Sequence, residues 1–173
     1  MLGVPTRMSE QPKIMTNRDN VFYWLSCPVV FICTRHGQQR DIMTATAMMI
    51  SEKEPLLVIS VAQGHLTARL IEASGEFTAA ITSEAQKNLA IQLGSTRGDK
   101  LDKYDQFKIE TIDNEHTREL IPVDSAAWLQ CRVENTQSIG GYRLITGRVE
   151  TQKDLNRRPL IWRQDSFFQL APV

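Results

Sequence analysis

The stretch that most constrains the fold runs from residue 41 to residue 77, where an apolar strand leads directly into a short helix. Residues 56–62, L-L-V-I-S-V-A, are almost wholly apolar and predict a central strand that is covered on both faces. The helix is predicted to begin at Gly64 and His65 and to end at Gly75, since glycine suits the left-handed conformation that ends many helices.

A helix that follows a strand in this way can hold an anion, because its free backbone N–H groups and its dipole point at the incoming charge. Thr67 lies in the first turn and adds a hydroxyl group. His65 has two interpretations, a residue that only starts the helix or one that contacts a ligand. The sequence alone leaves both open.

The other predicted elements are mostly strands joined by hairpins. A second helix starts with the capping box of Ser83 and Gln86 and stops at Gly94. Strands are predicted at residues 28–34, 42–44, 76–82, 128–136, 142–150, 160–162 and 167–170, with a turn around Gly37. This pattern predicts an α+β, mainly β protein with an antiparallel sheet, closed into a barrel because so many strands need their edges covered.

One domain is expected over residues 17–173, preceded by a flexible N-terminal lead-in over residues 1–16, which is polar and contains two prolines. Twenty basic residues balance twenty acidic ones, which disfavours a nucleic-acid partner. No apolar run is long enough to span a membrane and no signal-peptide pattern is present, so a cytoplasmic location is expected.

No residue pattern predicts a metal site or a protein nucleophile. The three cysteines form no C-x-x-C pair, the three histidines are far apart, and no G-x-S-x-G motif is present. The loop at residues 94–100, G-S-T-R-G-D-K, fails the spacing of a phosphate loop for nucleoside triphosphates. Any chemistry is therefore expected to depend on a cofactor.

The small residues at 43–46, M-T-A-T, have two interpretations. Threonine suits a tight strand, and the same small side chains would let a flat ring approach the backbone closely, with Thr44 and Thr46 adding hydrogen bonds. The presence of Ser60 and Thr67 nearby in sequence favours the second interpretation.

In their order and spacing, several segments between residues 28 and 170 resemble the flavin reductase-like family of FMN-binding split barrels. The segments that carry the resemblance are P-V-V-F-I-C-T-R-H-G, R-D-I-M-T-A-T-A, E-P-L-L-V-I-S-V, H-L-T-A-R-L-I-E-A-S-G-E-F, G-D-K-L-D-K-Y and I-G-G-Y-R-L-I-T-G-R-V-E. The resemblance implies an antiparallel Greek-key split β-barrel with two or three short helices.

The resemblance also implies a function, that of an NAD(P)H-dependent flavin oxidoreductase. It implies a homodimer that binds FMN, with FAD as the alternative, and uses NAD(P)H as co-substrate, in some cases with a flavin-dependent monooxygenase as partner. The implied cofactor-binding residues are Met43, Thr44, Ala45, Thr46, Ser60, Val61, Ala62, His65, Thr67, Lys100 and Trp162. The phosphate would lie near Thr67 and the ring along residues 43–46 and 60–62.

Three positions depart from the family pattern. Asp41 and Ala80 stand where the family often has asparagine, and Tyr142 stands where it commonly has histidine near the flavin or nicotinamide. Tyr142 is therefore the candidate residue beside the nicotinamide, although no side-chain acid or base is required for hydride transfer. A non-catalytic FMN-binding or electron-relay protein of the same fold, and a ferric reductase, are the alternative functions. Lys100, Tyr142 and Trp162 also have purely structural interpretations, as a solvated loop lysine and as barrel packing.

Overall fold

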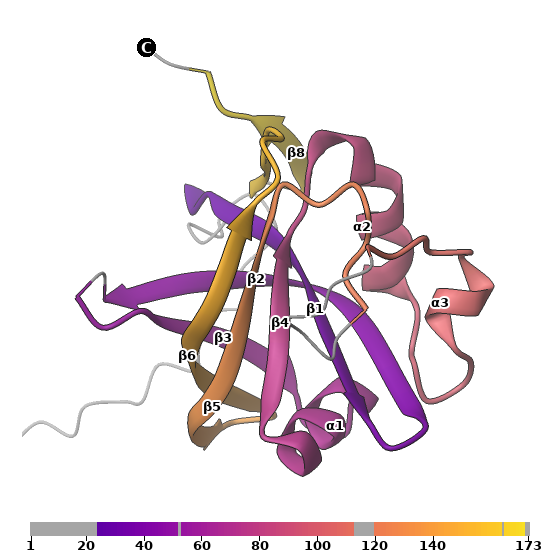
Figure 1. Ribbon diagram of the computed structural model, residues 1–173, viewed down its shortest axis with the longest axis vertical. Coiled ribbons are helices and arrows are strands. Elements are labelled where there is room, and N and C mark those ends of the chain that lie inside the picture. Colours follow the sequence, from indigo (N-terminus) through magenta and orange to yellow (C-terminus); the bar gives the residue numbers. More distant parts are fainter. Residues whose placement is uncertain (1–23, 52, 113–119, 164, 172–173) are drawn as a thin grey trace, which may run out of the picture.

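An antiparallel sheet closes on itself into a six-stranded barrel in this computed structural model (Figure 1). The structure describes residues 24–51, 53–112, 120–163 and 165–171. The strand order around the barrel is β1-β2-β3-β6-β5-β4 and back to β1, and β7 and β8 extend the sheet beyond β1. The strands are β1 (Cys27–His36), β2 (Gln39–Ser51), β3 (Leu56–Ala62), β4 (Glu76–Ile81), β5 (Ala127–Ile139), β6 (Tyr142–Asp154), β7 (Leu160–Arg163) and β8 (Ser166–Gln169).

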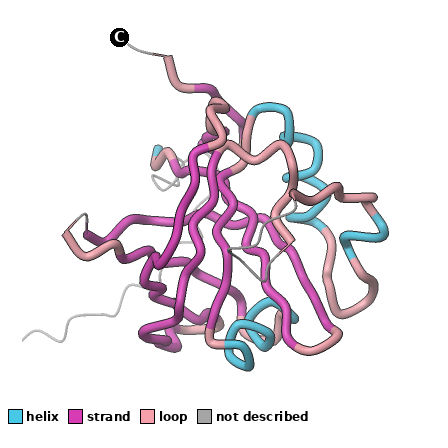
Figure 2. The backbone as a smooth tube through the Cα atoms, in the orientation of Figure 1, coloured by secondary structure: helices cyan, strands magenta, loops and turns pink. Residues whose placement is uncertain are grey.

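The short helices of the described residues lie around the side and at one end of the barrel, as the tube in Figure 2 shows. They are α1 (Leu66–Ser74), α2 (Lys87–Ser95), which follows the 3-10 turn η3 (Glu84–Gln86), and α3 (Lys103–Gln106). Helix α1 lies at the lower end of the barrel in Figure 1 and contributes Ala68 and Ile71 to its core. Gly75 ends α1 with a φ of 75°, and Ser83 and Gln86 form the predicted capping box.

Strand β1 is buried on both faces because it separates two hydrophobic cores. Val30 and Ile32 point into the barrel, where they join a cluster that includes Phe77. Val29 and Phe31 point outward into a second cluster, which also contains residues of α2 and of the 120–128 region. The second core explains why α2 packs on the outside of β1 and β2. In β2, the helix covers residues 42–44.

The mainly β barrel with short helices confirms the predicted fold, and the predicted strands and both predicted helices are present. The prediction that residues 56–62 are covered on both faces was wrong. Leu57, Ile59 and Val61 are buried in the barrel, whereas Ser60 is exposed, because no described helix covers the outer face of β3. The third helix, α3, lies in the charged region at residues 95–124, where periodicity gave no helix.

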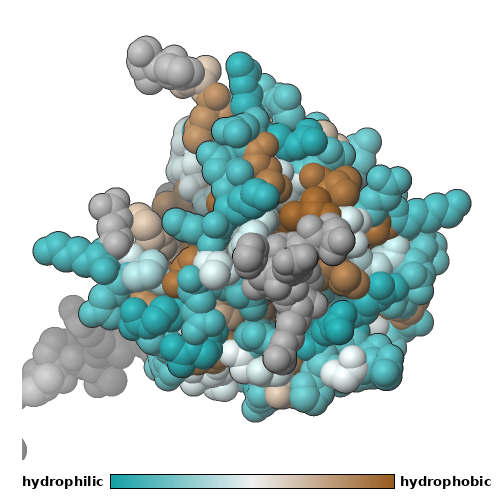
Figure 3. Space-filling view, viewed as in Figure 1, coloured by the Kyte–Doolittle hydropathy of each residue, from teal (hydrophilic) through white to brown (hydrophobic). Residues whose placement is uncertain are grey.

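The predicted boundary between residues 16 and 17 lies outside the described residues. Within the described parts of the chain, no helix has the length and apolar character needed to cross a membrane. The face seen in Figure 3 is mostly hydrophilic, and its hydrophobic residues are grouped mainly in the upper half, around α2.

Gly147 on β6 lies where the barrel interior leaves no room for a side chain. A Cβ atom at this position would lie 2.8 Å from both Cys131 and the Phe77 ring. We expect Gly147→Ala to lower the free energy of unfolding by about 1–3 kcal/mol, because overpacking forces neighbours from their preferred rotamers. Urea unfolding would measure the change. Gly141→Ala is the matched control, since nothing lies within 4 Å of its added Cβ, and an equal loss in both variants would contradict the explanation.

Candidate functional site

The barrel is open between the first half of β2 and the end of β3. Strand β1 pairs with residues 39–46 of β2, but β3 pairs only with residues 47–51. Residues 60–62 of β3 pair with β6 instead. In the described chain, no strand pairing joins residues 43–46 to residues 60–62, so the two segments predicted to hold a flat ring face each other across a split in the barrel.

On the β2 side of this split, the side chains of residues 43–46 point in different directions. Met43 and Ala45 pack against the inner core. Thr44 points outward, and its hydroxyl donates a 2.6 Å hydrogen bond to the Ala90 carbonyl of α2. Thr46 is exposed. What this segment presents to the split is therefore mainly its backbone edge, with Thr46 as the exposed hydroxyl.

On the β3 side, Ser60 is exposed, Val61 is buried and Ala62 is half-buried. Ala62 pairs with Tyr142, the first residue of β6, whose side chain is 55% exposed. Tyr142 also pairs with Ile139 across the β5–β6 hairpin. The structure therefore brings Tyr142 beside residues 60–62.

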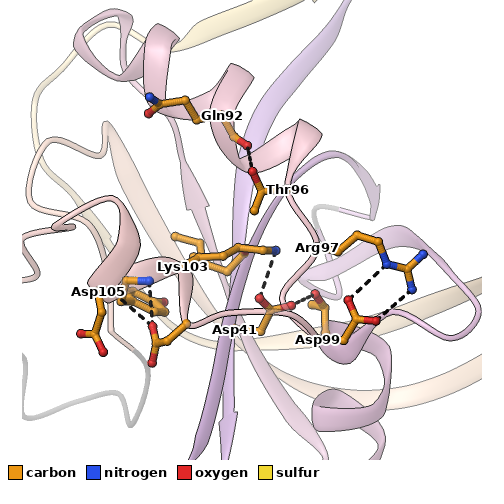
Figure 4. A network of polar contacts seen from close by, with 11 residues as sticks. Asp41, Gln92, Thr96, Arg97, Asp99, Lys103 and Asp105 are labelled. Atoms are coloured by element: carbon orange, nitrogen blue, oxygen red, sulfur yellow. Dashed lines mark hydrogen bonds and ion pairs between the residues drawn. The ribbon is translucent and has the colours of Figure 1, made fainter.

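At the end of the split, the start of α1 already holds an anion, the carboxylate of Asp41. Thr67 is buried, and its hydroxyl donates to Asp41 Oδ2 at 2.5 Å. Lys103 Nζ lies 3.0 Å from Asp41 Oδ1 (Figure 4). The same amino group donates a 2.7 Å hydrogen bond to the Ile42 carbonyl. A phosphate contact from Thr67 would require this hydroxyl to give up Asp41, so the phosphate role of Thr67 stays a prediction.

A small polar pocket of about 40 Å³ adjoins this cluster. It brings together the predicted site residues Met43, Thr44 and His65 with a loop that follows α2. His65 is the N-cap residue of α1 and makes no side-chain cap hydrogen bond. The complete lining is Asp41, Met43, Thr44, His65, Leu66, Leu93, Gly94, Thr96, Arg97, Gly98, Asp99 and Lys103. A pocket of this size is far below the roughly 300–1,000 Å³ of sites that enclose a cofactor, so it can accommodate only one end of a ligand that lies along the split.

Arg97 provides an exposed positive charge at the rim of this pocket. Its guanidinium group forms an ion pair with Asp99, with Nε 3.1 Å from Oδ1. The hydrogen bond from Arg97 lowers the pKa of the Asp99 carboxyl. Because both side chains are substantially exposed, this pair contributes little to stability. Replacing the Asp99 contact of Arg97 by a contact to a phosphate would therefore cost little free energy.

Two predicted site residues are not brought to the split. Lys100 is exposed in the loop between α2 and α3. Trp162 lies on β7, paired with Cys27 of β1, and packs against the outer hydrophobic core. Sequence reasoning missed Lys103 and Arg97. The signal for Lys103 was Asp41, an acidic residue directly before the apolar pair Ile42 and Met43 of a predicted strand.

The described residues contain no group of histidine, cysteine, aspartate and glutamate that could hold a metal ion. The three cysteines are free, with Cys33 and Cys131 buried and Cys27 half-buried. Burial raises the pKa of the Cys131 thiol to about 12. This thiol is therefore protonated at neutral pH and is no candidate nucleophile.

Comparison with known proteins gives a family and a set of similar folds. Residues 22–171 match the family model described as flavin reductase like domain. None of the curated proteins matches the chain significantly.

Three solved structures illustrate the similarity in fold. The NADH:FAD oxidoreductase SgcE6 of Streptomyces globisporus has a TM-score of 0.81 at 19% identity, covering 97% of this chain and 100% of that one. The FMN-binding protein of Thermus thermophilus, with bound p-hydroxybenzaldehyde, has a TM-score of 0.77 at 16% identity, covering 98% and 100%. BorF, the flavin reductase component of a bacterial two-component tryptophan halogenase, has a TM-score of 0.76 at 18% identity, covering 88% and 96%.

Proposed function

From the premise that this chain belongs to the flavin reductase like domain family, we propose that it passes hydride from NAD(P)H to flavin, either bound FMN or an exchangeable flavin. The chain is an oxidoreductase of the flavin reductase kind. The single observation that carries the proposed site is the edge of β2 at residues 43–46, which pairs with no other described strand and lies opposite residues 60–62 of β3.

The residues on both sides of the split fit a flat ring. Backbone N–H and C=O groups need partners, and in the described chain no strand supplies them along this edge of β2. Ala45 and Ala62 are small, while Thr46 and Ser60 are exposed hydroxyl groups on either side. These features let the isoalloxazine edge of FMN, or of FAD, approach the backbone and take hydrogen bonds from it.

The phosphate end of the flavin is proposed to lie at the polar pocket. His65, Thr96 and Arg97 line it, and the exposed Lys100 lies three residues after Arg97. Thr67 would act there through Asp41, with which its hydroxyl is engaged. A guanidinium group suits a phosphate because it offers several N–H donors in one plane.

Bound flavin would supply the redox chemistry by accepting hydride at N5 from nicotinamide C4. The part of this chain is to orient the ring and to aim backbone donors at the region where negative charge grows during the transfer. No side-chain acid or base is needed for this step. Tyr142, half exposed beside Ala62, would offer an aromatic surface to the nicotinamide.

We also propose a homodimer whose interface is the uncovered outer face of β2, β3 and β6. On this face Met48 pairs with Val58, which pairs with Thr146. Met48 is 63% exposed, and Ile50, two residues further along β2 at a break in the register, is 50% exposed. The β2–β3 hairpin that carries them projects from the left of the barrel in Figure 1. Exposed apolar side chains grouped in this way typically mark an association surface.

The electron acceptor proposed for this activity is a flavin-dependent monooxygenase that receives the reduced flavin. BorF, the flavin reductase component of a two-component halogenase, supports an acceptor of this class because it has the same fold. A cytoplasmic location is proposed with it, since the three cysteines of the chain are free and that compartment contains the nicotinamide and flavin pools.

Steady-state oxidation of NADH and NADPH with free FMN or FAD tests this function. We expect flavin-dependent loss of the nicotinamide absorbance with at least one of the two nucleotides. Rates that stay at background while FMN still binds would overturn the reductase activity and favour the electron-relay alternative.

Replacing Tyr142 by Ala should raise the KM for the nicotinamide more than that for the flavin.

A further inference from the structure

We propose that the buried cluster of Asp41, Lys103 and Thr67 is a positioning device that fixes the flavin-facing segment of β2. This inference rests on the proposed function, since it concerns the same site. The three residues come from β2, from the start of α3 and from α1. They therefore tie together the three elements that meet at the end of the split.

The cluster acts directly on the backbone that leads into the site. Lys103 Nζ donates to the carbonyl of Ile42, the residue just before Met43, at 2.7 Å. Asp41, one residue earlier, is fixed by Lys103 on one oxygen and by Thr67 on the other. The main chain at the start of residues 43–46 is thus held from two sides, and the position of its free edge depends on these bonds.

The loop that lines the polar pocket packs against the same carboxylate. A Cβ atom added to Gly98 would lie 2.2 Å from Asp41 Oδ1, so the backbone of Gly98 packs directly against Asp41. Arg97 and Asp99 flank this glycine and line the pocket. Figure 4 shows Asp41 between Lys103 and this loop. Asp41 consequently fixes the ring segment and the proposed phosphate loop relative to each other.

The stability of the fold does not by itself explain why an ion pair is buried at Asp41 and Lys103. Asp41 and Lys103 have side chains only 2% and 3% exposed. Removing two charges from water costs about as much as their attraction returns, so apolar residues of similar volume often serve stability equally well. An ion pair with directed hydrogen bonds can fix the position of residues 43–46, whereas an apolar pair of the same volume cannot.

The double variant Asp41→Leu/Lys103→Met tests this role, because it removes both charges and leaves neither unpaired. We expect the double variant to stay folded, while the Kd for FMN rises by about tenfold to a hundredfold, the loss typical of removing the outer partners that orient the groups of a binding site. The visible spectrum of its bound FMN should also move towards that of free FMN. Arg157→Met, which breaks the exposed pair with Asp124, is the control and should bind FMN normally.

An FMN affinity within about twofold of the unmodified protein, in a folded double variant, would overturn the inference. If the double variant does not fold, Thr67→Val decides, because it removes one hydrogen bond and keeps the ion pair. Thr67→Val should fold and bind FMN several times more weakly, and normal binding would again overturn the inference. If the unmodified protein binds no FMN, the proposed function fails, an outcome distinct from both.

Discussion

Replacing Lys103 by methionine is expected to lower the free energy of unfolding by about 3–5 kcal/mol, among the largest effects of a single substitution in this chain. The methionine fills a similar volume, but it leaves the Asp41 carboxylate buried without its positive partner. It also removes the hydrogen bond to the Ile42 carbonyl. Urea unfolding followed by circular dichroism would measure the loss.

The matched control is again Arg157→Met, since Arg157 and Asp124 are about half exposed and their pair is screened by water. A loss below about 1 kcal/mol is expected there. Adding Asp41→Leu to Lys103→Met should restore most of the lost stability, because no unpaired charge then remains. Equal losses for Lys103→Met and Arg157→Met would contradict the description of Asp41 and Lys103 as a buried pair.

Replacing Met48 by glutamate is expected to convert the proposed homodimer into monomers. Met48 is 63% exposed in the single chain, so the substitution should leave the fold of one subunit intact. In a dimer that buries this face, an unpaired carboxylate costs about 3 kcal/mol or more, which raises the dimer dissociation constant by a hundredfold or more. Light scattering coupled to size-exclusion chromatography would show the change in mass.

Ile91→Glu is the control, because Ile91 is 50% exposed and lies on α2, which packs against the first half of β2 around Thr44 and not against the proposed interface around Met48. This variant should keep the mass of the unmodified protein. A dimer that persists in Met48→Glu, or one lost equally in Ile91→Glu, would place the association surface elsewhere. FMN affinity in the monomeric Met48→Glu variant would further show whether the second copy completes the flavin site.

Most of the fold could be predicted from the sequence because its signals are local. Alternating side chains and hairpin turns at Gly37 and Gly140 specify neighbouring antiparallel strands. The burial of β3 was harder to predict, because an apolar outer face at Val58 means either a covering helix or an association surface. Sequence periodicity cannot distinguish these two, and the described chain contains no helix on that face.

The site could be predicted only in part, for a different physical reason. Residues 43–46 were recognised from their small and hydroxyl side chains and residues 60–62 from the family resemblance, and the structure places the two segments on opposite sides of the split. The partner of Thr67 could not be predicted, because the contact with Asp41 spans 26 residues and depends on how α1 packs against β2. The phosphate contact expected of Thr67 stays a prediction, since its hydroxyl donates to Asp41.

The central claim is that the split between β2 and β3 holds a flavin that nicotinamide can reduce. The visible spectrum of the protein after incubation with FMN and removal of free flavin, before and after anaerobic addition of NADH or NADPH, tests it most directly. We predict a yellow protein whose flavin absorbance is lost when at least one of the two nucleotides is added. A protein that stays colourless after incubation with FMN and with FAD would contradict the claim.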